Sequence, residues 1–493
     1  MNEHPGRHAL QRVRIRGMLE LLTPAHLGNG ETVGLTDIPL LRDPAEGRLP
    51  LLTGTSLAGA LRSYLREYEH GYGRLEERND LAEQLFGAIQ DRSSAQSWLL
   101  VDDSLGHAPD TALATQGAPE EKKAPETELR DGVSIRHDTR TAREDFKFDV
   151  ELLEAGTEFQ LRLELLLPEG KPALAEGLAI ALWGLQEGEI GLGLRKRRGL
   201  GECRVNAWWV RWYDLTTATG LLSWLADDDT GEQSGQDILA LLRVQPAQVD
   251  QRQEFAIEQA RFALDSSLLI RSGSSDPLAP DAVHLRSRRR GQEQPILSGT
   301  SLAGALRARA LRIALTVRPD VADELVNDMF GRQLAGSDDK PSGSRVVTHE
   351  SPLQGPVLNL VQSRVKIDRF TGGAYPGALF TEQPAWGDGQ TGVEINLSLR
   401  CPAEDGLRDA EIGLLLLVLK DLWTGDLPLG GESSIGRGRL AGQSARLVLR
   451  GAGRSKEWTL TQEGEQVQVT GSGTRDELEG FVKAFHAYKE EAT

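Results

Sequence analysis

The sequence is short of cysteine, of long hydrophobic runs and of positive charge. Its only cysteines are Cys203 and Cys401, which argues against a disulfide framework and against a cysteine-based zinc site. No apolar stretch approaches the eighteen or so residues that a membrane span needs, and the N-terminus lacks a signal-peptide core. We therefore expect a cytoplasmic protein that has no zinc and does not enter a membrane.

The charge balance is acidic, with 73 aspartates and glutamates against 56 lysines and arginines and a net charge of −17. Taken alone, this total argues against nucleic acid, because phosphates bind to cations. Binding depends on local fields, however, and the positive residues cluster at Arg195-Lys196-Arg197-Arg198 and at Arg286 with Arg288-Arg289-Arg290. The sequence is thus compatible with a basic cleft on an acidic body.

A long exact repeat is the main feature that the chain does contain. Nine residues, Gly54–Arg62 (GTSLAGALR), recur letter for letter at Gly299–Arg307, an offset of 245 residues. The same offset aligns Pro50-Leu51-Leu52 with Pro295-Ile296-Leu297, and Asp37 aligns with Asp281 after a one-residue slip. A period of this length indicates a duplicated whole domain rather than a solenoid.

Each copy has the same predicted order of elements: strand, long loop, helix, strand, insertion, strand, helix, glycine loop, strand. Alternating segments such as 12–22 and 157–167 predict strands, and leucines every four residues after Gly54 predict a helix. This order predicts an α+β fold of two tandem ferredoxin-like (RRM-like) domains with antiparallel sheets. The predicted boundaries are a first domain at 1–215, a linker at 216–252, a second domain at 253–452 and a C-terminal extension at 453–493.

Each copy also has a glycine-rich loop near its end. The first is Gly191-Leu-Gly193, five residues, then Gly199-Leu-Gly201, and the second runs from Gly430-Gly431 to Gly436-Arg437-Gly438. Glycines let backbone N–H groups approach an anion, and the arginines add charge. A hairpin with a solvated basic tip explains one such loop equally well, but its presence in both copies favours RNA phosphates. The pattern is neither a Walker A loop nor a Rossmann turn, so we expect no nucleotide cofactor.

Four motifs, in the same order in both copies, resemble the RAMP superfamily of CRISPR-associated proteins. The glycine loop resembles that family's glycine-rich loop, and the segment LTPAHLGNG…LTDIPLLRDP…LPLLTGTSLAGALRSYL resembles type III effector backbone subunits of the Cas seven type. Residues 364–372 with 377–380 resemble the mid-domain signature, which residues 133–141 carry in degraded form. The fusion of two copies resembles type III-D systems, whereas type III-E effectors carry more copies and cysteine zinc sites.

The resemblance implies a ferredoxin-like palm with inserted thumb and fingers that polymerises along a CRISPR guide RNA. It implies target RNA as a second ligand and, as protein partners, a large Cas ten-type subunit, other RAMP backbone subunits and small subunits. It also implies an endoribonuclease, in which an aspartate in the loop before the repeated helix cleaves the target. In this sequence those aspartates are Asp37 and Asp281.

The chemistry of such a site needs little from the protein. RNA supplies its own nucleophile, the 2′-hydroxyl, which an aspartate can deprotonate directly or through a bound Mg²⁺. Asp37 is the residue expected to hold such a cation, and His26 is a candidate for proton transfer. Copy two departs from this pattern, because the 245-residue offset puts Arg271 in place of His26 and Asp276 competes with Asp281.

Further residues are expected to bind RNA because they lie in the glycine loops, in the mid-domain signature or at the start of the repeated helix. They are Ser56, Arg62, Arg136, Arg195, Lys196, Arg197, Arg198, Ser301, Arg307, Lys366, Arg369 and Arg437. Two alternatives remain open: a purely structural guide-binding subunit with inactive sites, and a Cas six-like nuclease that processes precursor RNA without metal.

Overall fold

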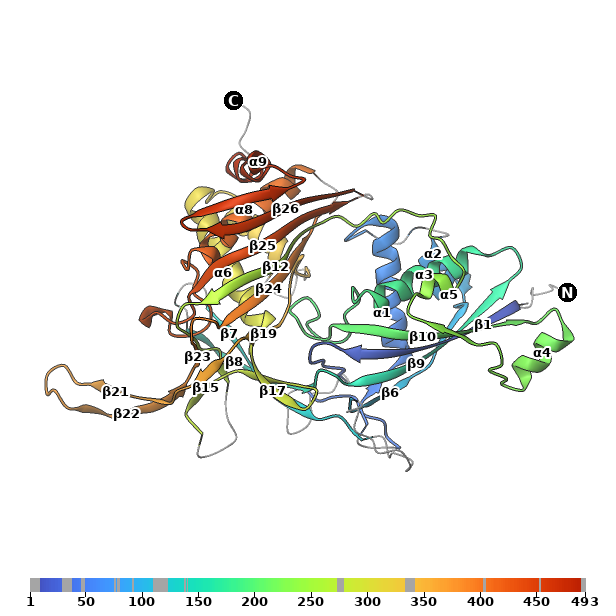
Figure 1. Cartoon of the computed structure of the whole chain (residues 1–493), viewed down its shortest axis with the longest axis horizontal. Helices are drawn as coiled ribbons and strands as arrows, with labels where there is room; N and C mark the ends of the chain where they lie inside the picture. Colours follow the sequence, from blue (N-terminus) through green and yellow to red (C-terminus); the bar gives the residue numbers. More distant parts are fainter. Residues whose placement is uncertain are drawn as a thin grey trace.

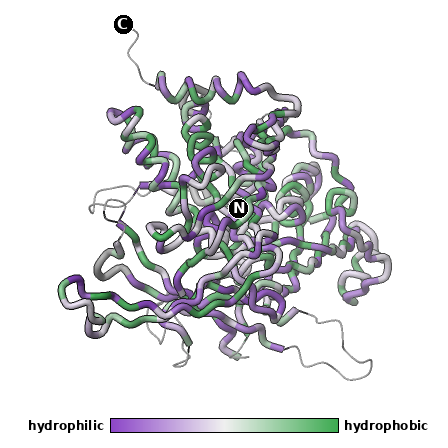
Figure 2. The backbone as a smooth tube through the Cα atoms, turned by 60° about the vertical axis from the view of Figure 1, so that its left-hand side comes forward, coloured by the Kyte–Doolittle hydropathy of each residue, from purple (hydrophilic) through white to green (hydrophobic). Residues whose placement is uncertain are grey.

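The chain folds into two lobes, one for each half of the sequence (Figure 1). The computed structural model describes residues 9–28, 38–45, 49–74, 77, 80–90, 93–109, 123–136, 139, 141–272, 279–332, 342–401, 405–451 and 454–488. Each lobe contains one large sheet with helices packed on one face. Hydrophobic and hydrophilic residues are interspersed along the chain in both lobes (Figure 2). Within the described residues, no helix is long and apolar enough to cross a membrane.

The first sheet is built around its first strand, whose residues Val13, Ile15 and Leu19 point into the core. On one side this first strand pairs antiparallel with Cys203–Asp214, the last strand of the copy. On its other side it pairs antiparallel with Glu158–Pro168. In spatial order the strands are β11 (Gln233–Gly235), β10 (Cys203–Asp214), β1 (Ala9–Leu21), β9 (Glu158–Pro168), β6 (Ser104–His107) and β2 (Leu51–Leu52), with β5 (Leu99–Val101) also on β9.

The second sheet repeats this arrangement around its own first strand and extends it at both edges. In spatial order its strands are β16 (Arg286–Arg289), β17 (Gln292–Leu297), β19 (Ser351–Gln354), β24 (Gly392–Arg400), β12 (Glu254–Leu264), β25 (Leu440–Gly451), β26 (Arg454–Glu463) and β27 (Gln466–Gly471), with β18 (Val346–Thr348) also on β24. The trio β25-β12-β24 therefore corresponds to β10-β1-β9.

The repeated nine residues begin a helix in each copy, as the sequence predicts. Thr53 accepts a hydrogen bond from the backbone N–H of Ser56 at the start of α1 (Gly54–His70), and Ser298 caps α6 (Gly299–Val317) in the same way through Ser301. The leucines that follow are buried on one face in both helices. The remaining core helices are α2 (Leu81–Phe86), α3 (Ala173–Gln186), α7 (Ala322–Phe330) and α8 (Asp405–Trp423).

Two paired-strand arms project from the sheets. The arm of copy one is β7 (Thr127–Ile135) with β8 (Ala142–Leu153), and that of copy two is β21 (Gln362–Ile367) with β22 (Ala374–Gln383). The second arm extends away from both lobes (Figure 1). The remaining short strands form small sheets of their own. β3 (Ala88–Gln90) pairs with β4 (Ser93–Ala95), β23 (Ala385–Gly387) lies between β13 (Ser267–Leu268) and β20 (Val357–Asn359), and β14 (Arg271–Ser272) with β15 (Ala282–His284) joins the second arm through β22.

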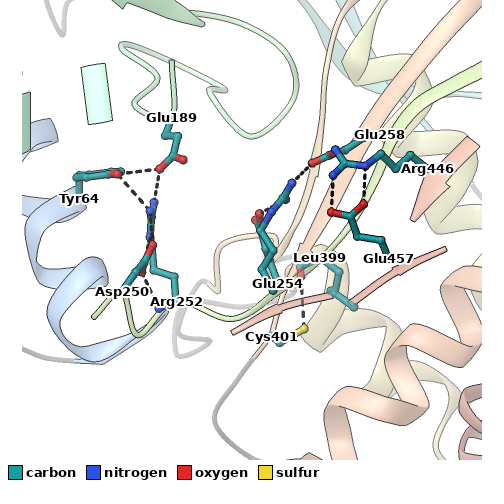
Figure 3. Close-up of polar contacts among 11 residues, drawn as sticks. Tyr64, Glu189, Asp250, Arg252, Glu254, Glu258, Leu399, Cys401, Arg446 and Glu457 are labelled. Carbon is teal, nitrogen blue, oxygen red and sulfur yellow. Dashed lines mark hydrogen bonds and ion pairs between the residues drawn. The ribbon is translucent and has the colours of Figure 1, made fainter. Parts of the chain in front are cut away.

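The linker is part of the folded structure. It contributes α4 (Ala218–Leu225), the edge strand β11 and α5 (Ile238–Leu241) to the first lobe. Its end is fixed by Arg252, which pairs with Asp250 and with Glu189 at 2.6 and 2.7 Å (Figure 3). The C-terminal extension adds β26 and β27 to the second sheet, and α9 (Arg475–His486) packs on α8. The architecture is thus a duplicated α+β fold; its ferredoxin-like character stays a prediction.

Candidate RNA interface

The glycine loop of copy one lies in the junction between the lobes instead of projecting as a free tip. The backbone N–H of Thr348 donates to the carbonyl of Arg197 at 3.1 Å, and Arg198 forms a parallel bridge with Thr348. Gly199 has a positive φ of 81°, and a Cβ there would lie 2.8 Å from the carbonyl carbon of His349 and closer still to the amide nitrogen of Glu350. A glycine is required here because copy two packs directly against the loop.

The basic side chains of this loop have no carboxylate partners among the described residues. The pKa values of Arg195, Lys196, Arg197 and Arg198 are all lowered, in each case mainly by desolvation. The Arg197 guanidinium donates to the carbonyl of Ser344 at 2.7 Å, and Arg195 stacks on Phe148 at 4.5 Å. Lys196 and Arg198 keep exposed side chains. The four cations are therefore held close together without an ion pair to a described carboxylate, and Glu67 offsets only part of the desolvation of Lys196 and Arg197. This arrangement favours an anionic ligand.

Both copies contribute to this basic cluster. Desolvation, and after it the charge of Arg198, lowers the pKa of Arg307 in copy two. Arg307 itself donates to the Gly331 carbonyl at 2.6 Å and to Asn327 at 2.7 Å. Arg400, which lies outside every motif that the sequence suggested, stacks on Tyr72 at 4.5 Å. Arg400 also forms an ion pair with Glu67, with 3.4 Å between guanidinium and carboxylate.

The glycine loop of copy two has a different environment. Arg437 is 3% exposed, and its guanidinium pairs with Glu382 at 2.9 Å and with Glu432 at 3.1 Å. Arg364 and Arg271 pair with the same two carboxylates. Two carboxylates thus neutralise Arg437, while its Nη1 has no hydrogen-bond partner among the described residues; its role in RNA binding stays a prediction.

The two aspartates expected to be catalytic can be compared only in part, since Asp37 lies outside the described residues. Asp281 directly precedes β15 and is exposed. Its carboxylate accepts hydrogen bonds from the N–H and the hydroxyl of Thr381, at 2.7 and 3.1 Å. These bonds lower its pKa, so Asp281 is fixed as a carboxylate against the base of the arm.

The strand register supports the alignment of Asp37 with Asp281. Ile38 bridges Val150 in parallel, and Ala282 pairs with Glu382 in parallel. Each aspartate is thus followed in sequence by a residue that bridges the returning strand of its arm. The described residues contain no group of three or more histidine, cysteine, aspartate or glutamate side chains that could hold a metal. The Mg²⁺ expectation therefore rests on Asp37.

His26 is buried in the segment that follows β1. It is 3% exposed, its Nδ1 is 2.8 Å from the carbonyl of Glu151, and a Cβ at Gly28 would lie 2.6 Å from its Nε2. This geometry suits a residue that holds the backbone between His26 and Gly28 against the first arm. The backbone also corrects the alignment of its twin, because Leu194 and Gly431 donate to the carbonyls of His26 and Leu269. The counterpart of His26 is therefore Leu269 and not Arg271.

The remaining expected contacts lie at helix starts and on the arms. Ser56 is exposed and Ser301 is half-buried, each in the first turn of its helix. Arg62 is half-buried further along α1. Arg136 lies at the far end of the first arm, whereas Lys366 and Arg369 are exposed on the second, where Lys366 stacks on Tyr375 at 4.9 Å. Phe370, at the tip of the second arm, is 97% exposed, although a hydrophobic residue is expected to be buried.

Comparison with known proteins agrees with this organisation. A profile of the RAMP superfamily matches the chain twice, at residues 18–204 and 261–441. No curated protein matches the chain. The two matched segments coincide with the two lobes and together cover most of the sequence, and the family consists of CRISPR-associated RNA-binding subunits. The chain belongs to the RAMP superfamily and carries two of its domains in tandem.

Proposed function

We propose that this protein is a guide-RNA-binding backbone subunit of a type III CRISPR effector, and that it cleaves target RNA in that complex. The observation that carries the proposal is the unneutralised basic cluster at the junction, where Arg195, Lys196, Arg197 and Arg198 meet Arg307. A guide strand crossing the junction would bring phosphates to cations that lack carboxylate partners among the described residues, and each contact would release bound counterions.

The test of guide binding is the salt dependence of single-stranded RNA affinity for the intact chain. Lys196→Ala with Arg198→Ala removes two exposed cations of the cluster and should lower the slope of log K against log salt by about 1.4. The matched control is Arg454→Ala with Arg475→Ala, two exposed arginines of the C-terminal extension, far from the junction motifs in sequence. An equal slope in both double variants would contradict the assignment.

We propose further that the subunit assembles head to tail with other RAMP domains. Copy one contacts copy two through its glycine loop and through its arm. In the arm Arg130 pairs with the buried Glu350 of copy two, and Glu128 accepts a hydrogen bond from the backbone N–H of Arg288 of copy two at 2.7 Å. Copy two carries the same elements, and a Cβ at Gly436, the twin of Gly199, meets nothing within 4 Å. A heterologous contact that does not close on itself builds an open filament.

Cleavage is tested by replacing the two aspartates separately in the assembled complex. Asp37→Ala and Asp281→Ala should each abolish one cut in the target RNA while leaving guide binding unchanged, and removal of divalent cations should stop cleavage if Asp37 holds Mg²⁺. Asp476→Ala is the matched control, because it removes an exposed carboxylate of the C-terminal extension, outside both expected catalytic loops. Intact cleavage in both variants would leave a purely structural subunit, and cleavage of precursor RNA by the chain alone would favour a Cas six-like nuclease.

A further inference from the structure

The outer face of the first sheet, opposite α1 and α3, carries cationic and aromatic side chains in ordered rows. Residues paired directly across β9, β1 and β10 share a face, and one such row consists of Arg162, Arg16 and Trp209. The adjacent row towards the linker contains Arg14 and Arg211, and the row on the other side contains Gln160 and Met18. Arg16 on β1 therefore lies directly across from Arg162 on β9.

Two arginines directly opposite each other destabilise a sheet, and copy two shows the balanced alternative. In copy two Arg261 lies directly across from Glu394, with 3.6 Å between guanidinium and carboxylate. The hydrogen bonds from Leu21 to Thr157 and from Leu264 to Thr391 place Arg261 at the position that Met18 takes in copy one. Further along the same sheet Arg446 pairs with Glu258 and Glu457 (Figure 3). Copy one thus has Gln160 where copy two has Glu394, and its Arg162 corresponds to Asn396.

The linker neutralises only part of this face. Asp227 and Asp229 pair with Arg14, and Glu232 pairs with Arg16 and raises its pKa. Arg162 is exposed, and among the described residues no carboxylate pairs with it. The linker carboxylates therefore lie at the positions that phosphates would take, and they leave the cation at the centre of the sheet without an anion.

A cavity lies next to the unpaired cation. It has a volume of about 160 Å³ and is lined by Arg16, Gly17, Met18, Gln160 and Trp209. An indole and a thioether offer stacking surfaces, and the Gln160 amide offers both a hydrogen-bond donor and an acceptor. Together with an adjacent guanidinium, these groups match a nucleobase and its phosphate.

Packing within the protein explains the other aromatic residues of β10 but not Trp209. Trp208 is fully buried in the core, the Trp212 indole N–H donates to the carbonyl of Leu241 at 3.4 Å, and the Tyr213 hydroxyl donates to the carbonyl of Asp228 at 3.3 Å. Trp209 is half-buried and borders the cavity. It is the aromatic residue of this strand that is left for a ligand.

We propose that this face is a second site for single-stranded RNA, separate from the junction. A base stacks on Trp209 and Met18 with its polar edge on Gln160, and the adjoining phosphate lies between Arg162 and Arg16. The linker carboxylates compete with that phosphate, because Glu232 already occupies Arg16. RNA is favoured over an acidic protein because the cavity combines a stacking surface with an unpaired guanidinium, and aromatic stacking on a strand is a common way to hold an unpaired base.

The test uses the intact chain with Lys196→Ala and Arg198→Ala as background, so that the junction contributes little. The probe is a uridine oligomer of about ten nucleotides carrying 4-thiouridine, with affinity followed by fluorescence anisotropy and contacts by crosslinking and mass spectrometry. Trp209→Ala should weaken binding roughly 5- to 150-fold, and Trp209→Phe should restore most of it. Arg162→Glu should also abolish the crosslink to β10, while allowing the pairing that Arg261 and Glu394 make in copy two.

Glu232→Gln should strengthen binding at low salt, because it removes one of the two carboxylates that pair with Arg16 and leaves only Asp229, at 3.5 Å. The matched controls are Arg261→Ala, an exposed arginine on the central strand of the second sheet, and Glu465→Gln, an exposed acid of the extension; neither should change the affinity. Absence of a crosslink to residues 203–214 in the background protein would overturn the proposal. So would unchanged affinity in Trp209→Ala and Arg162→Glu, or capture of an acidic protein by this face without RNA binding. Loss of the junction site alone would leave this site intact, which distinguishes the two proposals.

Discussion

Two glycines at equivalent places in the two glycine loops allow a direct measurement of the contact between the copies. Gly199 and Gly436 have positive φ values of 81° and 90°, so an alanine at either position costs about 1–2 kcal/mol of backbone strain. Only Gly199 faces another chain segment, because its Cβ would lie 2.8 Å from the His349 carbonyl carbon, whereas Gly436 faces open space. Forcing atoms into such a packed contact costs about 1–3 kcal/mol more.

We therefore expect Gly199→Ala to destabilise the protein by about 2–5 kcal/mol and Gly436→Ala by about 1–2 kcal/mol. Urea unfolding followed by circular dichroism, with the slope m checked for each variant, gives both values. Equal destabilisation, within about 0.5 kcal/mol, would show that the loop of copy one does not pack against copy two. In an assembled complex the order should reverse, since Gly436→Ala would then obstruct the next subunit.

Two further predictions concern buried ionisable groups. Burial lowers the pKa of His284 to about 4, below about 6.5 in the unfolded chain, so its contribution to stability is complete above pH 6.5 and is lost as the pH falls towards 4, in total about 3 kcal/mol. His284→Leu, which introduces the residue found at the twin position Leu40, should flatten the pH dependence of the unfolding free energy over that range, and an unchanged slope would contradict this. Glu350→Gln removes the carboxylate shared by Arg130 and Arg289 and should destabilise the junction by about 3–5 kcal/mol, seen as faster proteolysis between the lobes. Glu457→Gln, at an exposed pair, should cost under about 1 kcal/mol, and a similar loss in both variants would refute the role of the buried pair.

The sequence predicted the elements whose cause is local. The repeated motif starts a helix in both copies because Thr53 and Ser298 each cap the first turn and the leucines that follow lie on one face. Strands with alternating residues, such as β1 and β9, were also predictable from a period of two. The alignment of Asp37 with Asp281 relied on sequence spacing, and the pairing of Ile38 and Ala282 with the arms agrees with it.

The environment of each charged side chain could not be predicted, because it depends on residues far away in sequence. Arg437 and Arg197 lie in similar glycine loops, yet Arg437 meets Glu382 and Glu432 whereas Arg197 meets the backbone of copy two. The offset of the repeat also placed Arg271 opposite His26, and the hydrogen bonds to the His26 and Leu269 carbonyls correct this by two residues. Insertions between the motifs shift the register, and only backbone pairing reveals by how much.

The sequence by itself determined that this chain is a duplication, which family its motifs resemble and where its helices begin, since all three depend on residue identity and short-range spacing. Tertiary structure alone decided which cations remain unpaired. The basic loop of copy one is held at the junction without an ion pair to a described carboxylate, its twin is neutralised, and Arg162 lies directly across from Arg16 with no carboxylate paired to it among the described residues. The physical reason is that charge acts through space, over distances that folding sets and spacing along the chain does not.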